Sequence, residues 1–212
     1  MKIIFIIFSF LPFILASSRI KPEIEGEIVY LDGTQKSGII SRFVGVDENI
    51  KIKKDSKSKS EKISTSLLKY IILKSDESVD TFHILRPAGF WGSKLKVYKY
   101  LYIAYKVYHS ERMDGYIVNF DDYNMIGSPT ARMKFNTTGV VLFVKTPEKE
   151  EIIELTTDIE GSVVIAKNKL MRKNFIKVLD GKCPEMEKVL EDKKYKVEDF
   201  VTMLEDYNKT CN

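Results

Sequence analysis

The residue types that most often carry catalysis occur in this 212-residue chain without the spacing that catalysis needs. Its only histidines, His83 and His109, lie far from each other and from both cysteines, so they form no zinc or redox motif. Ser66 and Lys69 match the S-x-x-K pattern of penicillin-binding enzymes, but the partner motifs of those enzymes are poorly matched. We therefore predict no catalytic residue, metal ligand or cofactor, and the sequence leans against an enzyme.

The paired carboxylates Asp121 and Asp122 are the remaining candidates for hydrolytic chemistry. Together with Asp114 and Asn124 they could offer oxygen ligands to Ca²⁺, although their spacing is not that of an EF-hand loop. The same residue types are typical of a solvated turn. We expect the turn, and keep the two aspartates as the candidate catalysts if the protein is a hydrolase.

Alternating tyrosines are the most distinctive candidate for ligand binding. Tyr98, Tyr100, Tyr102 and Tyr108 would share one face of a strand, and Trp91 precedes them between two glycines. An exposed row of rings would stack on sugar rings or bind a partner's apolar patch. A covered row would be ordinary sheet packing, because tyrosine is a good strand former. The candidate ligand-binding residues are Trp91, Tyr98, Tyr100 and Tyr102.

The two cysteines, Cys183 and Cys211, each adjoin a predicted helix. Pro184 suits the first position of one helix, and apolar residues recur at helical spacing over 197–207. In an antiparallel helical hairpin the start of the first helix lies beside the end of the second, so we expect a Cys183–Cys211 disulfide. Such a bond persists in oxidising compartments.

Hydrophobic periodicity predicts an α+β fold that is mostly β. Short alternating segments over 25–85 predict a first group of strands, and those over 94–157 predict a second group. From residue 161 the apolar spacing becomes helical. We expect tandem small antiparallel β modules, each barrel-like or a curled sheet, followed by a C-terminal helical region. The expected segments are a leader at 1–18, β modules at 19–90 and 91–160, and helices at 161–212.

The leader has the pattern of a secretory signal. Lys2 is its only charge, the segment 3–15 is apolar except for one serine and one proline, and small residues follow. The apolar segment is shorter than the roughly 20 residues that a spanning helix needs. Cleavage is expected after Ala16 or Ser18, which leaves an extracytoplasmic chain with no transmembrane segment.

Two short patterns resemble uncharacterised secreted proteins of gram-negative bacteria. The first is an opening G-x-I-x-x-x-D-G-x-x-x-x-G-x-I pattern, and the second lies in the last thirty residues; they consist of Gly26, Ile28, Asp32, Gly33, Gly38, Ile40, Cys183, Pro184, Tyr195, Asp206, Tyr207, Asn208 and Cys211. In that group a signal peptide precedes a small β module and a closing pair of helices. The resemblance implies an envelope location in the periplasm, on the cell surface or in the medium, and it carries over no activity.

Charge is balanced overall and uneven locally. The chain has 34 basic and 30 acidic residues, so no polyanionic partner is demanded and nucleic acid is not expected as a ligand. Residues 51–62 carry a net charge of +4 and residues 185–206 a net charge of −4. The basic segment could contact anionic lipid or polysaccharide, and the acidic segment a partner, or both could be solvated faces.

Taken together, these features favour a secreted, non-enzymatic envelope protein of binding or scaffold type. The expected partner is an envelope polysaccharide or an envelope protein. Two alternatives stay open, namely a small hydrolase acting on envelope polymers and a purely structural subunit. The sequence leaves the oligomeric state undetermined.

Overall fold

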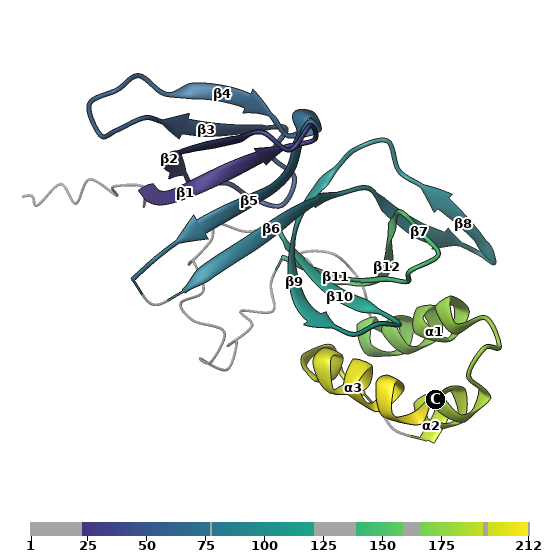
Figure 1. Cartoon of the computed structure of the whole chain (residues 1–212). Coiled ribbons are helices and arrows are strands. Elements are labelled where there is room, and N and C mark those ends of the chain that lie inside the picture. The colour runs from purple at the N-terminus through teal and green to yellow at the C-terminus, as the bar shows by residue number, and fades with distance from the viewer. Residues whose placement is uncertain (1–22, 77, 121–138, 159–165, 193–194, 212) are drawn as a thin grey trace, which may run out of the picture.

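Twelve strands and three helices account for most of the described chain (Figure 1). The computed structural model describes residues 23–76, 78–120, 139–158, 166–192 and 195–211. The strands are β1 (Glu23–Tyr30), β2 (Gln35–Ser41), β3 (Asn49–Lys53), β4 (Glu61–Ser64), β5 (Leu68–Lys74), β6 (Val79–Leu85), β7 (Pro87–Trp91), β8 (Lys94–Val97), β9 (Tyr102–His109), β10 (Asp114–Asn119), β11 (Val140–Lys145) and β12 (Ile152–Asp158). The helices are α1 (Lys167–Leu179), α2 (Pro184–Asp192) and α3 (Phe200–Thr210), with one-turn 3-10 helices η1 (Thr65–Leu67) and η2 (Val197–Asp199).

The strands form one mixed sheet in the order β4-β3-β2-β1-β5-β6-β9-β10-β11-β12-β7-β8. Every neighbouring pair is antiparallel except β12 and β7, which run parallel. The sheet is open, with β4 at one edge and β8 at the other. The prediction of an α+β, mostly β fold with a C-terminal helical region is confirmed.

The first strands curl around a core rich in isoleucine. Apolar residues alternate with polar ones along β1, β3 and β5, as they must when one face of a sheet is buried and the other is wet. The core also receives side chains from β6 and β9, which connect these strands to the rest of the sheet. Its buried members are Ile28, Ile40, Phe43, Ile50, Ile52, Ile63, Leu68, Ile71, Leu73, Phe82 and Ile103.

Strand β11 is buried on both of its faces, which explains its unbroken apolar sequence. Leu142 and Val144 face the helices and pack in a cluster with Phe175 and Phe200. The intervening Phe143 faces the other side of the sheet, in a second cluster that contains Tyr102. The helices therefore cover one face of this part of the sheet, and an aromatic cluster occupies the opposite face.

The connection between β2 and β3 ties the first strands to β9 and β10. The Gly45 amide donates a hydrogen bond to the Asn119 carbonyl at 2.7 Å, and the Ile103 amide donates to the Gly45 carbonyl at 2.9 Å. A Cβ atom at Gly45 would lie within 3.0 Å of the Val118 side chain and the Asn119 carbonyl oxygen, so only glycine permits this approach.

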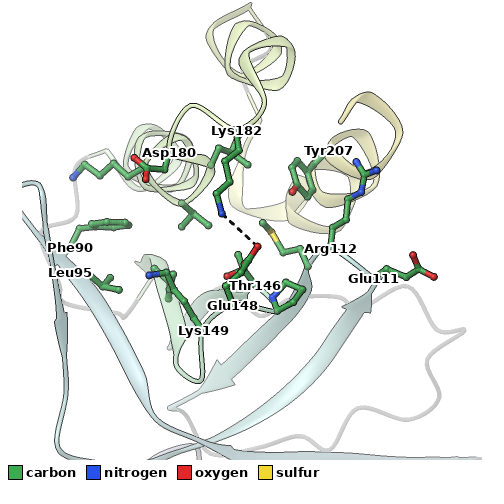
Figure 2. A pocket seen from close by; sticks show the side chains of 16 residues that line it. Phe90, Leu95, Glu111, Arg112, Thr146, Glu148, Lys149, Asp180, Lys182 and Tyr207 are labelled. Atoms are coloured by element: carbon green, nitrogen blue, oxygen red, sulfur yellow. Dashed lines mark ion pairs between the residues drawn. The ribbon is translucent and has the colours of Figure 1, made fainter. Parts of the chain in front are cut away.

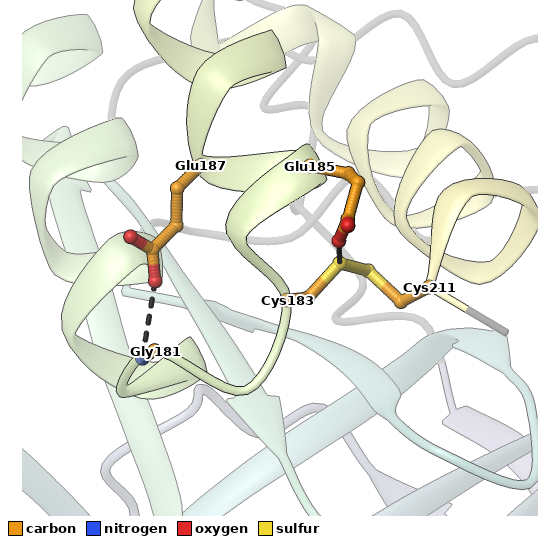
Figure 3. Close-up of a disulfide and its surroundings, with 5 residues drawn as sticks. All are labelled: Gly181, Cys183, Glu185, Glu187 and Cys211. Carbon is orange, nitrogen blue, oxygen red and sulfur yellow. Dashed lines mark hydrogen bonds between the residues drawn. A yellow bond between two sulfur atoms is a disulfide. The ribbon is translucent and has the colours of Figure 1, made fainter.

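The helices are closed by the disulfide that the sequence predicts. Cys183 directly precedes α2 and Cys211 directly follows α3, and their Cα atoms lie 5.7 Å apart (Figure 3). Helix α1 is followed by Asp180 and Gly181, which both have positive φ, and the Gly181 amide donates to the Glu187 carboxylate at 3.1 Å. Pro184 occupies the first position of α2.

Two groups of predictions fall outside the described residues. These are the secretory signal at 1–18 and the carboxylate pair Asp121 and Asp122. Among the described helices, none is both long and apolar enough to span a bilayer.

Candidate functional site

The end of the sheet that contains β7 and β8 presents aromatic rings on one face. Pro87, Gly89 and Trp91 share that face by strand alternation, while Phe90 points to the other face and packs under the helices. The hydroxyl of Tyr98 lies over Gly89, closer than 3.0 Å to where a Cβ atom would be. Trp91 lies two residues after Gly89 on the same face of β7, and the Lys96 ammonium lies 5.9 Å from the centroid of its ring.

The tyrosines continue this row as a stack. Tyr98 and Tyr100 have ring centroids 5.3 Å apart and planes inclined by 11°, and Tyr100 and Tyr102 have centroids 5.1 Å apart. Tyr102 in turn makes edge contacts with Phe120 and Phe143 at 5.4 and 5.6 Å. We call Trp91, Tyr98, Tyr100 and Tyr102 the aromatic strip.

Exposure changes along the aromatic strip. Trp91 is 80% exposed, Tyr100 is 50% exposed and Tyr102 is only 8% exposed. The sequence left open whether the row is exposed or covered. In the structure its Trp91 end is exposed to solvent and its Tyr102 end is buried in the core. Burial raises the pKa of the Tyr98 and Tyr102 phenols, so both stay protonated at neutral pH.

The tyrosines do not form one continuous strand face, as a single long strand would have required. Strand β8 ends at Val97 and β9 begins at Tyr102, so Tyr98 and Tyr100 lie in the bend between them. Tyr108, expected on the same face, packs instead against the cluster under the helices. A register shift between β9 and β10 interrupts the alternation before Tyr108 is reached.

A pocket of about 460 Å³ adjoins the exposed part of the strip. It lies between the residues that precede β9, η1 and the β2–β3 connection, and its lining is Val46, Glu48, Ser64, Thr65, Ser66, Lys99, Tyr100, Leu101 and Tyr102. The amide and hydroxyl of Thr65 both donate to the Glu48 carbonyl, at 2.9 and 3.1 Å, which holds two of its walls together. The pocket therefore combines aromatic rings with hydroxyl, carboxylate and ammonium groups.

Glu154 is a neighbour of the strip that sequence reasoning missed. It pairs with Phe143 in the β11–β12 register, and its negative charge contributes to the raised pKa of Tyr98 and Tyr102. Its carboxylate accepts a hydrogen bond from Thr157 at 2.7 Å. The available signal was a glutamate placed between the apolar residues Ile153 and Leu155.

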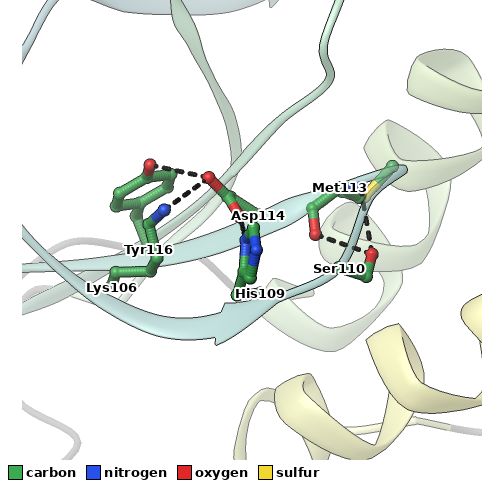
Figure 4. Close-up of polar contacts among 6 residues, drawn as sticks. All are labelled: Lys106, His109, Ser110, Met113, Asp114 and Tyr116. Atoms are coloured by element: carbon green, nitrogen blue, oxygen red, sulfur yellow. Dashed lines mark hydrogen bonds and ion pairs between the residues drawn. The ribbon is translucent and has the colours of Figure 1, made fainter.

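A second polar cluster surrounds Asp114 on β10 (Figure 4). Its carboxylate accepts from Lys106 at 2.7 Å, from His109 Nδ1 at 2.6 Å and from the Tyr116 hydroxyl at 3.1 Å. Burial alone would raise the pKa of Asp114, but these three donors outweigh it and hold the pKa below its usual value. His109 is exposed, and the hydroxyl of the adjacent Ser110 donates to the Met113 carbonyl at 3.0 Å.

His83 lies beside this cluster, with its ring 5.7 Å from that of Tyr116. Burial lowers the pKa of His83 to about 4, and the positive charges of Lys106 and Lys145 act in the same direction, against a smaller raising effect of Asp114. The imidazole is therefore neutral at physiological pH.

Another pocket, of about 470 Å³, separates the helices from the ends of the strands (Figure 2). Phe90 and Leu95 form one wall, and Tyr207 of α3 faces it from across the pocket. Lys182 and Glu148 form an ion pair at 3.5 Å within it. Basic and acidic side chains line this pocket in similar number. The pocket therefore does not favour a ligand of one charge.

The two residues of the S-x-x-K pattern have different neighbours in the fold. Ser66 lies 2.8 Å from Ser64 through their hydroxyl oxygens, in the turn of η1, while the Lys69 ammonium lies 5.9 Å from the ring centroid of Tyr70. These contacts assign Ser66 a structural role in the turn.

No protein-family model, curated protein or solved structure matches this chain. Its function is therefore inferred from the geometry of these residues.

Proposed function

We propose that the protein is a non-enzymatic, extracytoplasmic binding protein whose aromatic strip recognises a carbohydrate chain of the envelope. The observation that carries this proposal is the row formed by Trp91, Tyr98 and Tyr100, which is open to solvent at one end and anchored in the core through Tyr102. A row that served packing alone would be covered along its length.

Sugars suit this surface better than an apolar protein patch does. A sugar ring offers an apolar C–H face to stack on an aromatic ring and a rim of hydroxyls for hydrogen bonds. Beside Tyr100, the hydroxyls of Ser64 and Ser66 and the charged groups of Glu48 and Lys99 line the adjoining pocket. A few polar groups around an aromatic platform are typical of small-ligand sites.

The extracytoplasmic part of the proposal is supported by the cysteines. Both are joined in one disulfide, a bond that persists in oxidising compartments and is rare in the cytosol. The leader pattern at residues 1–18 points the same way.

The experiment uses Trp91, the only tryptophan of the chain, as an intrinsic reporter. A sugar stacked on this exposed ring should shift its emission to shorter wavelength and protect it from quenching by acrylamide. Soluble oligosaccharides are titrated, including N-acetylglucosamine oligomers of increasing length. Tyr100→Ala should weaken the titration, whereas Tyr70→Ala, on β5 and outside the strip, should leave it unchanged.

The outcomes separate binding from the alternatives. A saturable shift that Tyr100→Ala weakens supports the proposal. Absence of any shift with every glycan tested, or equal affinity in both variants, would overturn it. Release of reducing ends from a bound glycan would instead identify a hydrolase.

A further inference from the structure

The hairpin of β3 and β4, residues 49–64, carries an unusual concentration of lysine. It contains six lysines, two acidic residues, no arginine and no aromatic residue. We call it the lysine hairpin; its lysines are Lys51, Lys53, Lys54, Lys57, Lys59 and Lys62.

Both acidic side chains of the hairpin already have partners other than its lysine ammonium groups. Asp55 accepts from the amides of Lys57 and Ser58, at 2.9 and 2.8 Å, and so closes the turn. Hydrogen bonding by the Ser58 side chain and the Lys57 amide holds the pKa of Asp55 below its usual value, so it stays charged in this role. Glu61 is paired with Lys36 on β2.

Lys53 is neutralised as well, by an ion pair with Glu23. The five other lysines of the hairpin have no ion pair within the described part of the chain, and all five are exposed. The net charge of the hairpin is therefore not compensated by the fold.

The strand register adds to this repulsion. Lys51 lies directly opposite Lys62 in the β3–β4 ladder. Like charges at directly opposed positions destabilise a sheet. The pair adds nothing to the core, because the intervening Ile50, Ile52 and Ile63 already fill it. An external anion beside Lys51 and Lys62 would relieve the repulsion.

We propose that the lysine hairpin docks the protein on an anionic membrane surface. Lysine ammonium groups are hydrated point charges that suit a diffuse negative surface, whereas a discrete phosphate site favours the planar fork of arginine. The lysines also spread over both strands and the turn rather than converging on one point. Stacking on nucleic-acid bases would need aromatic side chains, which the hairpin lacks.

The position of the hairpin fits this role. It includes β4 at one edge of the sheet, whereas β7 and β8, where the aromatic strip begins, form the other edge. The hairpin reaches the pocket beside Tyr100 through its last residue, Ser64, and its lysine-bearing turn (residues 54–60) lies at the other end of its strands. In Figure 1 the hairpin projects from the body of the sheet, away from the helices. A membrane can therefore contact the hairpin while the strip stays free for its own ligand.

The test is co-sedimentation of the disulfide-bonded protein with vesicles of phosphatidylcholine, with or without phosphatidylglycerol. The variant replaces Lys51, Lys54, Lys57 and Lys62 with Gln. Its matched control replaces four exposed helix lysines, Lys169, Lys173, Lys188 and Lys209, with Gln. Each lysine near an anionic surface contributes about fivefold to partitioning, so the loss of four lysines should weaken partitioning by roughly several hundredfold.

Binding should require phosphatidylglycerol and weaken as salt is raised. The control variant should partition much more strongly than the hairpin variant. The control should keep the native unfolding midpoint because its substituted side chains are exposed, and the hairpin variant should keep or slightly raise it because Gln at positions 51 and 62 removes a like-charge pair. Equal partitioning of the two variants, or equal binding to neutral vesicles, would overturn the proposal. Binding to soluble heparin but not to anionic vesicles would also overturn it, in favour of an acidic polymer.

Discussion

The phenol of Tyr98 occupies the space that a side chain at Gly89 would need. A Cβ atom at Gly89 would lie within 3.0 Å of the Tyr98 hydroxyl oxygen and 3.2 Å from its Cζ. Gly89 is buried in β7, and its neighbour Ala88 is fully buried on the opposite face. Because Gly89 has no side chain, the ring of Tyr98, the first tyrosine of the aromatic strip, can pack directly over the backbone of β7.

Replacing Gly89 with Ala should displace Tyr98 and disturb the stack. We expect a loss of about 1–3 kcal/mol in the free energy of unfolding, as for other overpacked sites, and weaker glycan binding. Urea unfolding and the Trp91 titration measure the two effects. Because the closest contact is to the hydroxyl, Gly89→Ala combined with Tyr98→Phe should recover part of the lost stability. Strictly additive losses would show that the two residues do not interact.

Tyr100 and Tyr102 should respond differently to alanine. Tyr102 is buried against Phe120 and Phe143, so Tyr102→Ala should cost about 3–5 kcal/mol of stability. Tyr100 is half exposed, so Tyr100→Ala should change stability little and weaken glycan binding about 3- to 10-fold, the value of one aromatic contact. Chemical denaturation and the Trp91 titration separate the two effects. The same loss of stability in both variants would contradict the graded burial of the strip.

Local patterns in the sequence are enough to predict the elements, because they depend on nearby residues. Alternation in β1 and β3 indicates strands, and Pro184 together with the spacing after residue 197 indicates the helices that bring Cys183 and Cys211 together. Both signals, the spacing of apolar residues and the residue type at the end of a helix, can be recognised in a single sequence.

Local sequence patterns do not show which distant strands pair with each other. The parallel contact of Ile152 and Ile153 with Pro87 and Ala88 joins positions 65 residues apart and places β7 and β8 beside β12 at one edge of the sheet. The burial of Tyr102 likewise depends on Phe143, far along the chain. The alternation of Tyr98, Tyr100 and Tyr102 in the sequence does not show where a strand ends. It also does not show which of these rings Phe143 will bury.

The disulfide should account for a large part of the stability of the helical region. It links residues 28 positions apart, and a loop of that size corresponds to about 3–4 kcal/mol in the chain-entropy description. Unfolding in urea with and without reductant measures this contribution. The double variant Cys183→Ser and Cys211→Ser should match the reduced protein and be insensitive to reductant. If reduction left the midpoint of unfolding unchanged, the disulfide would be dispensable for this fold.

Acid should destabilise the fold through His83. The pKa of His83 is lowered to about 4 in the folded chain, chiefly by burial, against an unperturbed value of about 6.5. Between these two values the unfolded chain binds the additional proton, so stability falls as pH falls from about 6.5 to about 4. His83 retains some solvent access, so we expect a loss of about 1–2 kcal/mol rather than the full value of the shift.

The measurement is urea unfolding across this pH range in the wild type and in His83→Gln. The variant cannot take up the proton, so its stability should depend less on pH in this window, by the same 1–2 kcal/mol. Thr81→Ser, on the same strand as His83 and without an ionisable side chain, is the matched control. It should leave the difference between pH 6.5 and pH 4 close to that of the wild type. Parallel curves for the wild type and His83→Gln would show that the imidazole is not the group that titrates.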